Sequence, residues 1–335
     1  MDRFIEVRDL VKRFPGRGLD IRKGFLAVDK VSFGIERNSS FGLVGESGCG
    51  KTTLARSLMF LDPPSSGEVL LDGISLGALS RKDLRRMRWR MQIIFQDPNG
   101  ALSPKLSILG SMEEGLANKG FSKAERLKRI DGLLELVGIP STHAKRYPHE
   151  FSGGQKQRIV IARALSMEPD FLVLDEPVSS LDVSIQAQII NLLADIKEKF
   201  SLTYLFISHD LNLVSYLSGS IGVMYAGRLV ETGPTDSILG RPAHPYTSHL
   251  FSSVPSIGHT LASGSGAAGT EEAVDEEGRS GASPGITVSA SRTGCSYRGH
   301  CPRAVESCHL KVPELAPVGK DHFAACHVAE FCEDE

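Results

Sequence analysis

Apolar residues along this chain occur in short uninterrupted runs, and the segments between some of these runs have the spacing of helices. The runs are Phe41–Val44, Phe171–Leu174 and Tyr204–Ile207. A strand buried on both faces of a parallel sheet gives such a run, whereas a half-exposed strand alternates. Residues 185–200 lie between the second and third runs and fit a helix. This alternation of strand and helix predicts a doubly wound α/β core.

Shorter strand signals surround this core. Near the N-terminus Ile5–Val7 alternates and 27–33 fits a second strand, with a Gly-rich basic loop between them at 15–24. The other expected strands are 70–74, 93–95 and a hairpin that pairs 223–225 with 228–230.

Residues from about 98 to 165 are predicted to form a helical insert in this α/β chain. Ser122 and Glu125 have the spacing of a capping box, in which each side chain satisfies the other residue's backbone N–H. The apolar positions that follow fall on one side of a helix, and they are Leu127, Ile130, Leu134 and Val137.

The composition changes after about residue 255. Residues 256–292 are small, polar and acidic, have little to bury, and are predicted to be a flexible linker. Five of the six cysteines follow this segment. We therefore expect one large α/β domain over 1–255, a linker over 256–292 and a small Cys-rich extension over 293–335.

Charge and hydropathy narrow the possible partners. The chain has 38 basic and 40 acidic residues, so no nucleic-acid partner is expected. The first residues carry charges where a signal peptide needs an apolar core, and no run approaches the roughly 18–20 apolar residues of a membrane span. The sequence predicts a cytoplasmic protein whose membrane association comes through partners.

The stretch GESGCGKT matches the phosphate-binding pattern G-x-x-x-x-G-K-[ST] and lies between a predicted strand and a predicted helix. Its glycines allow backbone N–H groups to surround phosphates, while Lys51 reaches the outer phosphates and Thr52 offers a hydroxyl to Mg²⁺. The bland alternative is a Gly-rich turn with a surface lysine, and Cys49 is expected to be a small filler. The predicted ATP-binding residues of this stretch are Gly45, Glu46, Ser47, Gly48, Cys49, Gly50, Lys51, Thr52 and Thr53.

Polar residues follow three of the predicted strands. Asp175 ends one strand and can hold Mg²⁺, and Glu176 beside it can polarise an attacking water. Gln96 has an amide that can reach the metal and the water, although a plain turn residue is the alternative. His209 can contact a γ-phosphate, although a lone histidine is usually structural.

The stretch FSGGQKQR is a Gly-Gly turn that opens into a helix and can present backbone N–H groups to an anion. Together with GESGCGKT, Gln96, LVLDEP, Ser180-Leu181-Asp182 and His209, it resembles the nucleotide-binding subunit of an ABC transporter over about residues 5–255. This resemblance implies a RecA-like mixed sheet, an antiparallel β subdomain and an inserted helical subdomain.

The resemblance also implies that two such domains pair head to tail around two ATP molecules. Asp182 would communicate across the interface. Phe14 is where the family places an aromatic that stacks on adenine, and Phe25 is its rival. The residues that would act on the ATP bound by the other chain are Ser152, Gly153, Gly154 and Gln155.

Longer stretches narrow the resemblance. FQDPNGALSPKLSI, VMYAGRLVETG and RPAHPYTSHL are similar to ATPase subunits of bacterial dipeptide and oligopeptide importers, whose relatives carry nickel. This implies a second ATPase subunit, as a paralogous heterodimer or a homodimer, two transmembrane permease subunits and an extracytoplasmic substrate-binding protein. The chain would be peripheral on the cytoplasmic face of the bacterial inner membrane, and peptide or nickel cargo stays open.

The cysteines of the extension lack the paired C-x₂-C spacing of structural zinc sites, and in a reducing compartment they favour metal over disulfides. Four thiolates on short loops can enclose a [4Fe–4S] cluster, although the spacing alone leaves cluster, zinc and loose thiols open. The resemblance implies a cluster, with Cys332 as a spare and His309 and His327 as fallback ligands. The four predicted cluster ligands are Cys295, Cys301, Cys308 and Cys326.

Overall fold

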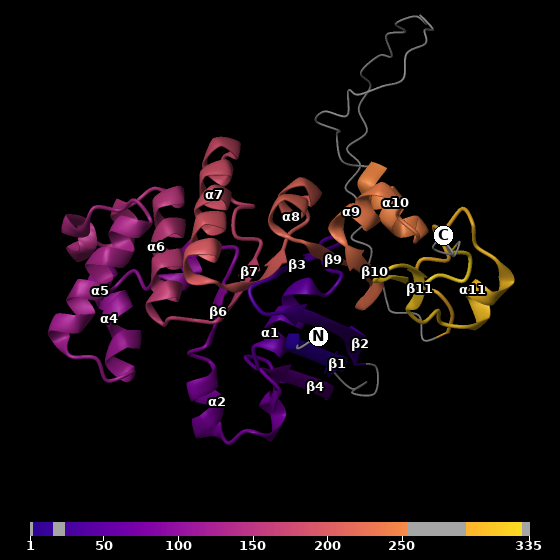
Figure 1. The fold of residues 1–335 in the computed structure, drawn as a ribbon, viewed down its shortest axis with the longest axis horizontal. Helices are drawn as coiled ribbons and strands as arrows, with labels where there is room; N and C mark the ends of the chain where they lie inside the picture. Colours follow the sequence, from indigo (N-terminus) through magenta and orange to yellow (C-terminus); the bar gives the residue numbers. More distant parts are fainter. Residues whose placement is uncertain (1–2, 16–23, 253–292, 330–335) are drawn as a thin grey trace, which may run out of the picture.

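The computed structural model describes residues 3–15, 24–252 and 293–329 (Figure 1). At the centre of this described part is an eight-stranded mixed sheet with the order β11-β12-β10-β9-β3-β8-β7-β6. The strands from β9 to β6 are parallel to one another, and β10, β12 and β11 continue the sheet antiparallel. Their bounds are β3 (Ser40–Val44), β6 (Met91–Ile94), β7 (Phe171–Asp175), β8 (Thr203–Ile207), β9 (Ser220–Tyr225), β10 (Arg228–Pro234), β11 (Ala316–Gly319) and β12 (His322–Ala324).

The central strands β7 and β8 are covered on both faces. Leu172 and Phe206 pack into a core with helices α6 (Gly153–Ser166) and α7 (Val183–Phe200). Val173 and Leu205 point the other way, into a second core with helix α1 (Lys51–Leu58) and the N-terminal strands. Since successive side chains of a strand face opposite sides, burial of both sides explains why these runs are apolar without alternation.

The N-terminal strands form a separate four-stranded antiparallel sheet with the order β2-β1-β4-β5. β1 is twelve residues long and has several register shifts against β2, so it extends well beyond the predicted 5–7. Part of the predicted basic loop, residues 16–23, lies outside the described residues. The bounds are β1 (Arg3–Phe14), β2 (Phe25–Glu36), β4 (Ser66–Leu71) and β5 (Ile74–Ser75).

The predicted helical stretch contains α3 (Pro98–Ala101), α4 (Ile108–Asn118), α5 (Lys123–Leu136) and α6. The capping box of Ser122 and Glu125 is confirmed at the start of α5. Ile130 and Leu134 of the predicted stripe are fully buried. Figure 1 shows α4, α5 and α6 at one end of the molecule, far from the C-terminal strands.

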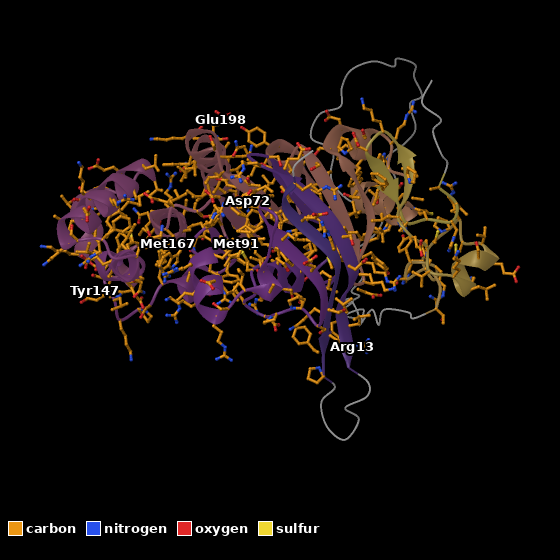
Figure 2. The ribbon with its side chains drawn as sticks, turned by 60° about the horizontal axis from the view of Figure 1, so that its bottom comes forward. Arg13, Asp72, Met91, Tyr147, Met167 and Glu198 are labelled. Carbon is orange, nitrogen blue, oxygen red and sulfur yellow. The ribbon has the colours of Figure 1, made fainter. Side chains whose placement is uncertain are left out.

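The remaining helices cover the sheet and its edges. Figure 2 shows the side chains that fill the spaces between the layers, with Met91 in the central part and Tyr147 and Met167 toward the helical end. Within the described ranges, no helix has both the length and the apolar character needed to cross a membrane. These helices are α2 (Arg81–Met87), α8 (Leu211–Leu217), α9 (Thr235–Gly240), α10 (Pro245–Ser252) and α11 (Glu306–Leu310), with short 3₁₀ turns at 76–78, 141–145 and 148–150.

The C-terminal residues 293–329 continue the main sheet. The predicted hairpin of β9 and β10 is confirmed, with Arg228 opposite Tyr225. On the other edge of β10, β12 pairs antiparallel, with Glu231 opposite Ala324, and β11 pairs with β12. The sequence did not predict these two strands. The predicted linker 256–292 and Cys332 lie outside the described residues.

Candidate functional site

The phosphate-loop stretch joins the carboxyl end of β3 to the start of α1. Gly45 has φ +150° and Gly50 has φ +111°, values that side chains with a Cβ rarely adopt. A Cβ at Gly45 would lie 2.2 Å from the carbonyl oxygen of Met224, and one at Gly50 would lie 2.3 Å from that of Ala27. These glycines are therefore required both by the backbone conformation and by the close approach of neighbouring strands.

Lys51 is buried within this loop. Its ammonium group donates to the carbonyl oxygens of Gly45 at 2.5 Å and Glu46 at 2.9 Å, and it lies 3.8 Å from the Cys49 Sγ. Burial raises the pKa of Cys49, so its thiol stays protonated. The lysine side chain is thus held inside the loop, beside a neutral cysteine.

Thr52 and Asp175 meet where α1 begins and β7 ends. The Thr52 hydroxyl donates to the Asp175 Oδ1 at 3.1 Å. Burial raises the pKa of Asp175, the Thr52 hydrogen bond opposes this shift, and the charge of Glu176 adds to it. A hydroxyl and a buried carboxylate are oxygen ligands that suit Mg²⁺, whose charge would offset the cost of burying the carboxylate. The pair fits the predicted metal site.

Glu176 follows directly in a strained backbone conformation, with φ +49°. Its N–H donates to the Ile207 carbonyl oxygen of β8 at 2.9 Å, which fixes the turn against the neighbouring strand. Its Oε2 lies 3.4 Å from the His209 Nδ1, and the His209 side chain is 60% exposed while that of Glu176 is 19% exposed. Two predicted catalytic residues from neighbouring strand ends are thus in contact.

Gln96 follows β6 and is exposed. Its carbonyl oxygen lies 3.5 Å from the Ser180 hydroxyl, so its loop contacts the segment that follows Glu176. Among the described contacts, its side chain makes no hydrogen bond to Thr52 or Asp175.

The second glycine loop, Ser152 to Gln155, starts helix α6. Ser152 Oγ accepts from the Gln155 N–H at 3.4 Å, and Gln155 Oε1 accepts from the Ser152 N–H at 3.0 Å. This capping box was not predicted, although its Ser-x-x-Gln spacing is visible in the sequence. Ser152, Gly153 and Gln155 are exposed. Figure 1 places α6 and α1 in separate parts of the molecule, so this loop and the phosphate loop do not meet within one chain.

The remaining predicted interface residues are exposed. Asp182 precedes α7 and is exposed, without a side-chain hydrogen bond to the helix N-terminus. Phe14 and Phe25 lie opposite each other in the pair of β1 and β2, and both rings are exposed. Lys12 Nζ lies 5.3 Å from the centre of the Phe14 ring. The two candidates for adenine stacking therefore share one place, at the end of the hairpin where residues 15–24 connect its strands.

Four cysteines of the extension lie close enough for their charges to interact. Burial raises the pKa of Cys326, and charges on Cys295, Cys301 and Cys308 would raise it further. The Cys295 N–H donates to the Cys308 carbonyl oxygen at 2.7 Å, which joins two of the loops. The cysteines that the structure describes are all free thiols.

The geometry of these thiols leaves the metal prediction open. Among the described residues, no group of three or more histidine, cysteine, aspartate or glutamate side chains is arranged to hold a metal ion. The fallback ligand His327 contacts the Lys311 carbonyl oxygen at 2.8 Å, and His309 is exposed. The cluster stays a prediction.

Comparison with known proteins gives the same assignment at both ends of the chain. Residues 28–179 match the ABC transporter family, and residues 230–308 match the C-terminal region of oligopeptide/dipeptide transporters. A peptide import ATP-binding protein of Brucella ovis is 45% identical over 324 residues, which are 96% of each chain. The oligopeptide transport ATP-binding protein AppF of Bacillus subtilis is 42% identical over 97% of each chain. This chain belongs to the oligopeptide/dipeptide group of the ABC transporter family.

Solved structures agree with this membership. The dimeric ATP-binding cassette MJ0796 bound to ADP and Pi has a TM-score of 0.62 at 28% identity, and the match covers 69% of this chain and 98% of that one. The cbiO1 protein from Clostridium perfringens has a TM-score of 0.63 at 28% identity, covering 75% of this chain and 100% of that one. The ABC ATPase fold, with its mixed sheet and helices, is confirmed, and the chain is an ATP-binding ATPase.

This ABC ATPase also contains buried polar residues that the sequence analysis did not single out. Glu231 is fully buried, and its carboxylate accepts hydrogen bonds from the backbone N–H groups of Ala243 and His244. The His322 Nε2 of the extension lies 2.7 Å from the same carboxylate. The sequence signals for this cluster were the stretches VMYAGRLVETG and RPAHPYTSHL, which indicated family membership without indicating a contact.

Proposed function

We propose that this chain powers the import of di- or oligopeptides by hydrolysing ATP in a dimer with a second ATPase subunit. The observation that carries this proposal is the combination in one chain of a Thr52–Asp175 nucleotide site and a C-terminal region of the oligopeptide/dipeptide transporter type. The names of the Brucella and Bacillus relatives support the peptide cargo. Nickel is the alternative cargo.

The chemistry assigned to the site follows from its charges. The backbone N–H groups from Ser47 to Thr53 would surround the phosphates, whereas the Glu46 N–H is bonded to Tyr246. Lys51 would neutralise the phosphate charge, and Thr52, Asp175 and Gln96 would hold Mg²⁺. Bound Mg²⁺ would neutralise developing charge on the phosphates. Glu176 accepts the proton of the attacking water. The His209 Nδ1, which lies 3.4 Å from the Glu176 Oε2, positions that water against the γ-phosphate.

The exposed glycine loop supplies the other half of each site. Ser152, Gly153 and Gly154 stand at the N-terminus of a fourteen-residue helix, where N–H groups and the helix dipole favour an anion. In the dimer this loop closes on the γ-phosphate held by the partner, with Gln155 and Asp182 at the interface. The arrangement is supported by the similarity of this chain to MJ0796, an ATP-binding cassette whose structure is dimeric. A paralogous heterodimer is the proposed form.

The membrane partners bind beside Gln96. A groove of about 460 Å³ lies between the end of β6 and the helices α4 and α6, and Trp89, Phe95 and Met112 contribute apolar walls. A groove of this size, with apolar walls and with Glu114 and Arg163 also in its lining, fits a short amphipathic helical segment of a permease subunit. The Gln96 loop would pass closure of the dimer to two permease subunits, and the chain would be peripheral on the cytoplasmic face of the inner membrane. An extracytoplasmic substrate-binding protein would deliver the cargo.

The four cysteines of the extension are proposed to hold a [4Fe–4S] cluster, with zinc as the alternative. The hydrogen bond from the Cys295 N–H to the Cys308 carbonyl oxygen joins two of their loops, and the four described thiols are free, which supports this. In the described residues the four side chains are not arranged around a common centre. We expect the protein purified without oxygen to be coloured, with iron and sulfide in equal amounts. Cys308→Ser should lose the iron and Cys49→Ser, in the phosphate loop, should keep it. Colourless protein with stoichiometric zinc contradicts the cluster.

The cargo is tested by reconstituting the chain with its partner ATPase, permeases and binding protein in liposomes. Labelled di- or oligopeptide should accumulate on the side of the liposome membrane that carries the ATPase subunits, and only when ATP is present on that side. Glu176→Gln should abolish this accumulation. Uptake of nickel without uptake of peptide contradicts the peptide assignment.

A further inference from the structure

Three tyrosines connect the phosphate loop with the C-terminal extension. Tyr246 of α10 is fully buried, and its hydroxyl accepts a hydrogen bond from the Glu46 N–H at 3.0 Å. The rings of Tyr225, at the end of β9, and Tyr297, in the extension, lie with their centres 4.5 Å and 5.4 Å from that of Tyr246. A residue of the extension therefore packs directly on a residue that contacts the ATP site.

The hydrogen bond to Tyr246 acts on the part of the loop that orients Lys51. The N–H of Glu46 is bonded to Tyr246, and the carbonyl oxygen of Glu46 accepts from the Lys51 ammonium at 2.9 Å. A shift of Glu46 would thus move a direct partner of the lysine. Burial raises the pKa of Tyr246, so the hydroxyl stays neutral.

Tyr246 is itself fixed by a chain of buried hydrogen bonds. Its N–H donates to the His244 Nδ1 at 3.0 Å, and the His244 N–H donates to Glu231 at 2.9 Å. Burial lowers the pKa of His244 to about 4, so its imidazole is neutral and can accept. Glu231 also contacts His322 at 2.7 Å. This series of hydrogen bonds therefore connects the extension with the phosphate loop.

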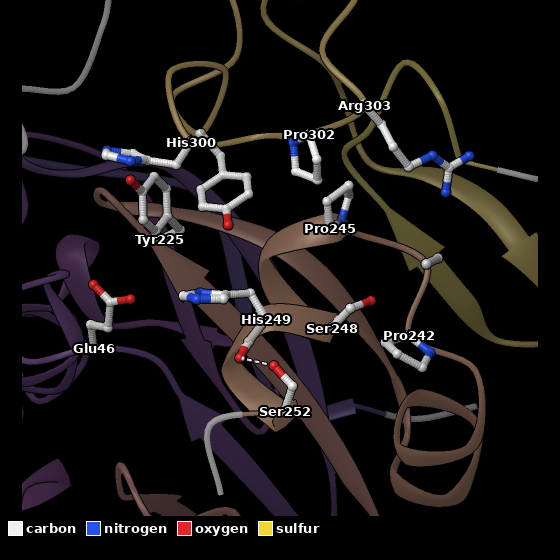
Figure 3. A pocket seen from close by; sticks show the side chains of 12 residues that line it. Glu46, Tyr225, Pro242, Pro245, Ser248, His249, Ser252, His300, Pro302 and Arg303 are labelled. Carbon is white, nitrogen blue, oxygen red and sulfur yellow. Dashed lines mark hydrogen bonds between the residues drawn. The ribbon is translucent and has the colours of Figure 1, made fainter. Parts of the chain in front are cut away.

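Packing alone does not hold Glu46 in place. A cavity of about 740 Å³ borders Glu46, Tyr225 and Tyr297 (Figure 3). In that view, the side chains of Glu46 and His249 border the same space. A residue beside a cavity lacks neighbours on one side. The Tyr246 hydroxyl restrains the Glu46 N–H, while the Lys51 ammonium and the Cys49 N–H both donate to the Glu46 carbonyl oxygen.

We propose that Tyr246 is a positioning residue for ATP binding and that the C-terminal extension holds it in place through Tyr297. The extension is then a support of the nucleotide site. This inference rests on ATP binding by the single chain and is independent of the proposed peptide cargo. A wild-type chain that binds no ATP would defeat the proposed function, whereas the variants below address only the positioning.

The first test compares two buried tyrosines in the full-length chain. Tyr246→Phe removes only a hydroxyl, and we expect affinity for a non-hydrolysable ATP analogue, measured by calorimetry, to fall about fivefold. Turnover at saturating ATP should stay within about twofold, because the reacting groups are unchanged. Tyr204→Phe is the matched control: Tyr204 is equally buried and its hydroxyl donates to the Leu193 carbonyl oxygen. It should keep wild-type affinity.

The second test separates the ring of Tyr297 from its hydroxyl. Tyr297→Leu removes the ring that packs on Tyr246 and should lower ATP affinity about threefold. Tyr297→Phe keeps the ring and should retain the wild-type affinity. An unchanged affinity in Tyr297→Leu overturns the support by the extension.

Hydrogen exchange tests the contact without any substitution. In the nucleotide-free wild-type protein, the Glu46 amide should exchange more slowly than the amides of Ser47 and Gly48. Equal exchange of the three amides overturns the proposal. It is also overturned if Tyr246→Phe binds ATP as the wild type does, or if Tyr204→Phe loses as much affinity as Tyr246→Phe.

Discussion

The two glycine loops of this ATPase have similar composition and opposite surroundings. In the phosphate loop, Gly45 and Gly50 approach the backbone of neighbouring strands to within distances that no Cβ allows, and Lys51 is buried. In the second loop, Gly153 is exposed, and Ser152 and Gln155 cap each other. The first loop is complete within one chain, whereas the second presents N–H groups outward. An exposed second loop is what its proposed action on ATP held by a partner chain requires.

The largest expected effect is a loss of ATP turnover that leaves both loops unchanged. Glu176→Gln should lower ATP turnover about 10³-fold, because an amide cannot accept the proton of the water. Both loops stay intact, so ATP binding should persist and closed dimers should accumulate on size-exclusion chromatography with ATP. Turnover near the wild-type rate would show that Glu176 is not the base.

The second expected effect is confined to the exposed loop. Gly153→Asp places a negative charge where the γ-phosphate of the partner site is proposed to bind, and hydrolysis should fall about a hundredfold. ATP affinity of the single chain should not change, and ATP-driven dimers should be lost. Gly132→Asp is the control, because a Cβ at Gly132 meets no atom within 4 Å and α5 is not part of the site. Loss of ATP affinity in Gly153→Asp would place this loop in the single-chain site.

The third expected effect is on folding. In Gly50→Ala, an alanine would have to adopt the left-handed φ of Gly50, and its Cβ would lie 2.3 Å from the Ala27 carbonyl oxygen. We therefore expect this variant to lower the free energy of unfolding by about 2 kcal/mol. In Gly153→Ala, the added Cβ meets only the Leu181 side chain, at 3.4 Å. The free energy of unfolding should therefore change by less than about 0.5 kcal/mol. Urea unfolding measures both. Equal effects would contradict the contrast between the loops.

The smallest expected effect is a gain of stability. The pKa of Asp175 is raised in the folded protein, mainly by burial, so its negative charge destabilises the fold at neutral pH. Asp175→Asn should raise the unfolding midpoint of the nucleotide-free protein slightly. This gain should disappear as the pH falls below the ordinary pKa of aspartate, where the carboxyl is protonated in both states. A gain that persists at acidic pH would exclude the charge as its cause.

The elements predicted best were those whose burial is complete. β7 and β8 were predicted because both of their faces are covered, so that Phe171–Leu174 and Tyr204–Ile207 form uninterrupted apolar runs. The capping box of α5 was predicted because its two residues interact across only three positions. β1 was predicted too short because its register shifts break the alternation on which the prediction relied. β11 and β12 were missed because they are only four and three residues long.

The sequence by itself determined the nucleotide chemistry, because a phosphate loop needs glycine, lysine and a hydroxyl at fixed spacing within eight residues. It also determined the acidic strand end and the family. Only the tertiary structure decided that Thr52 meets Asp175, that Glu176 meets His209, and that the extension reaches Glu46 through Tyr246. Each of these contacts joins residues that lie far apart in the chain or on different strands. Such contacts depend on strand order and helix packing, which local pattern does not encode.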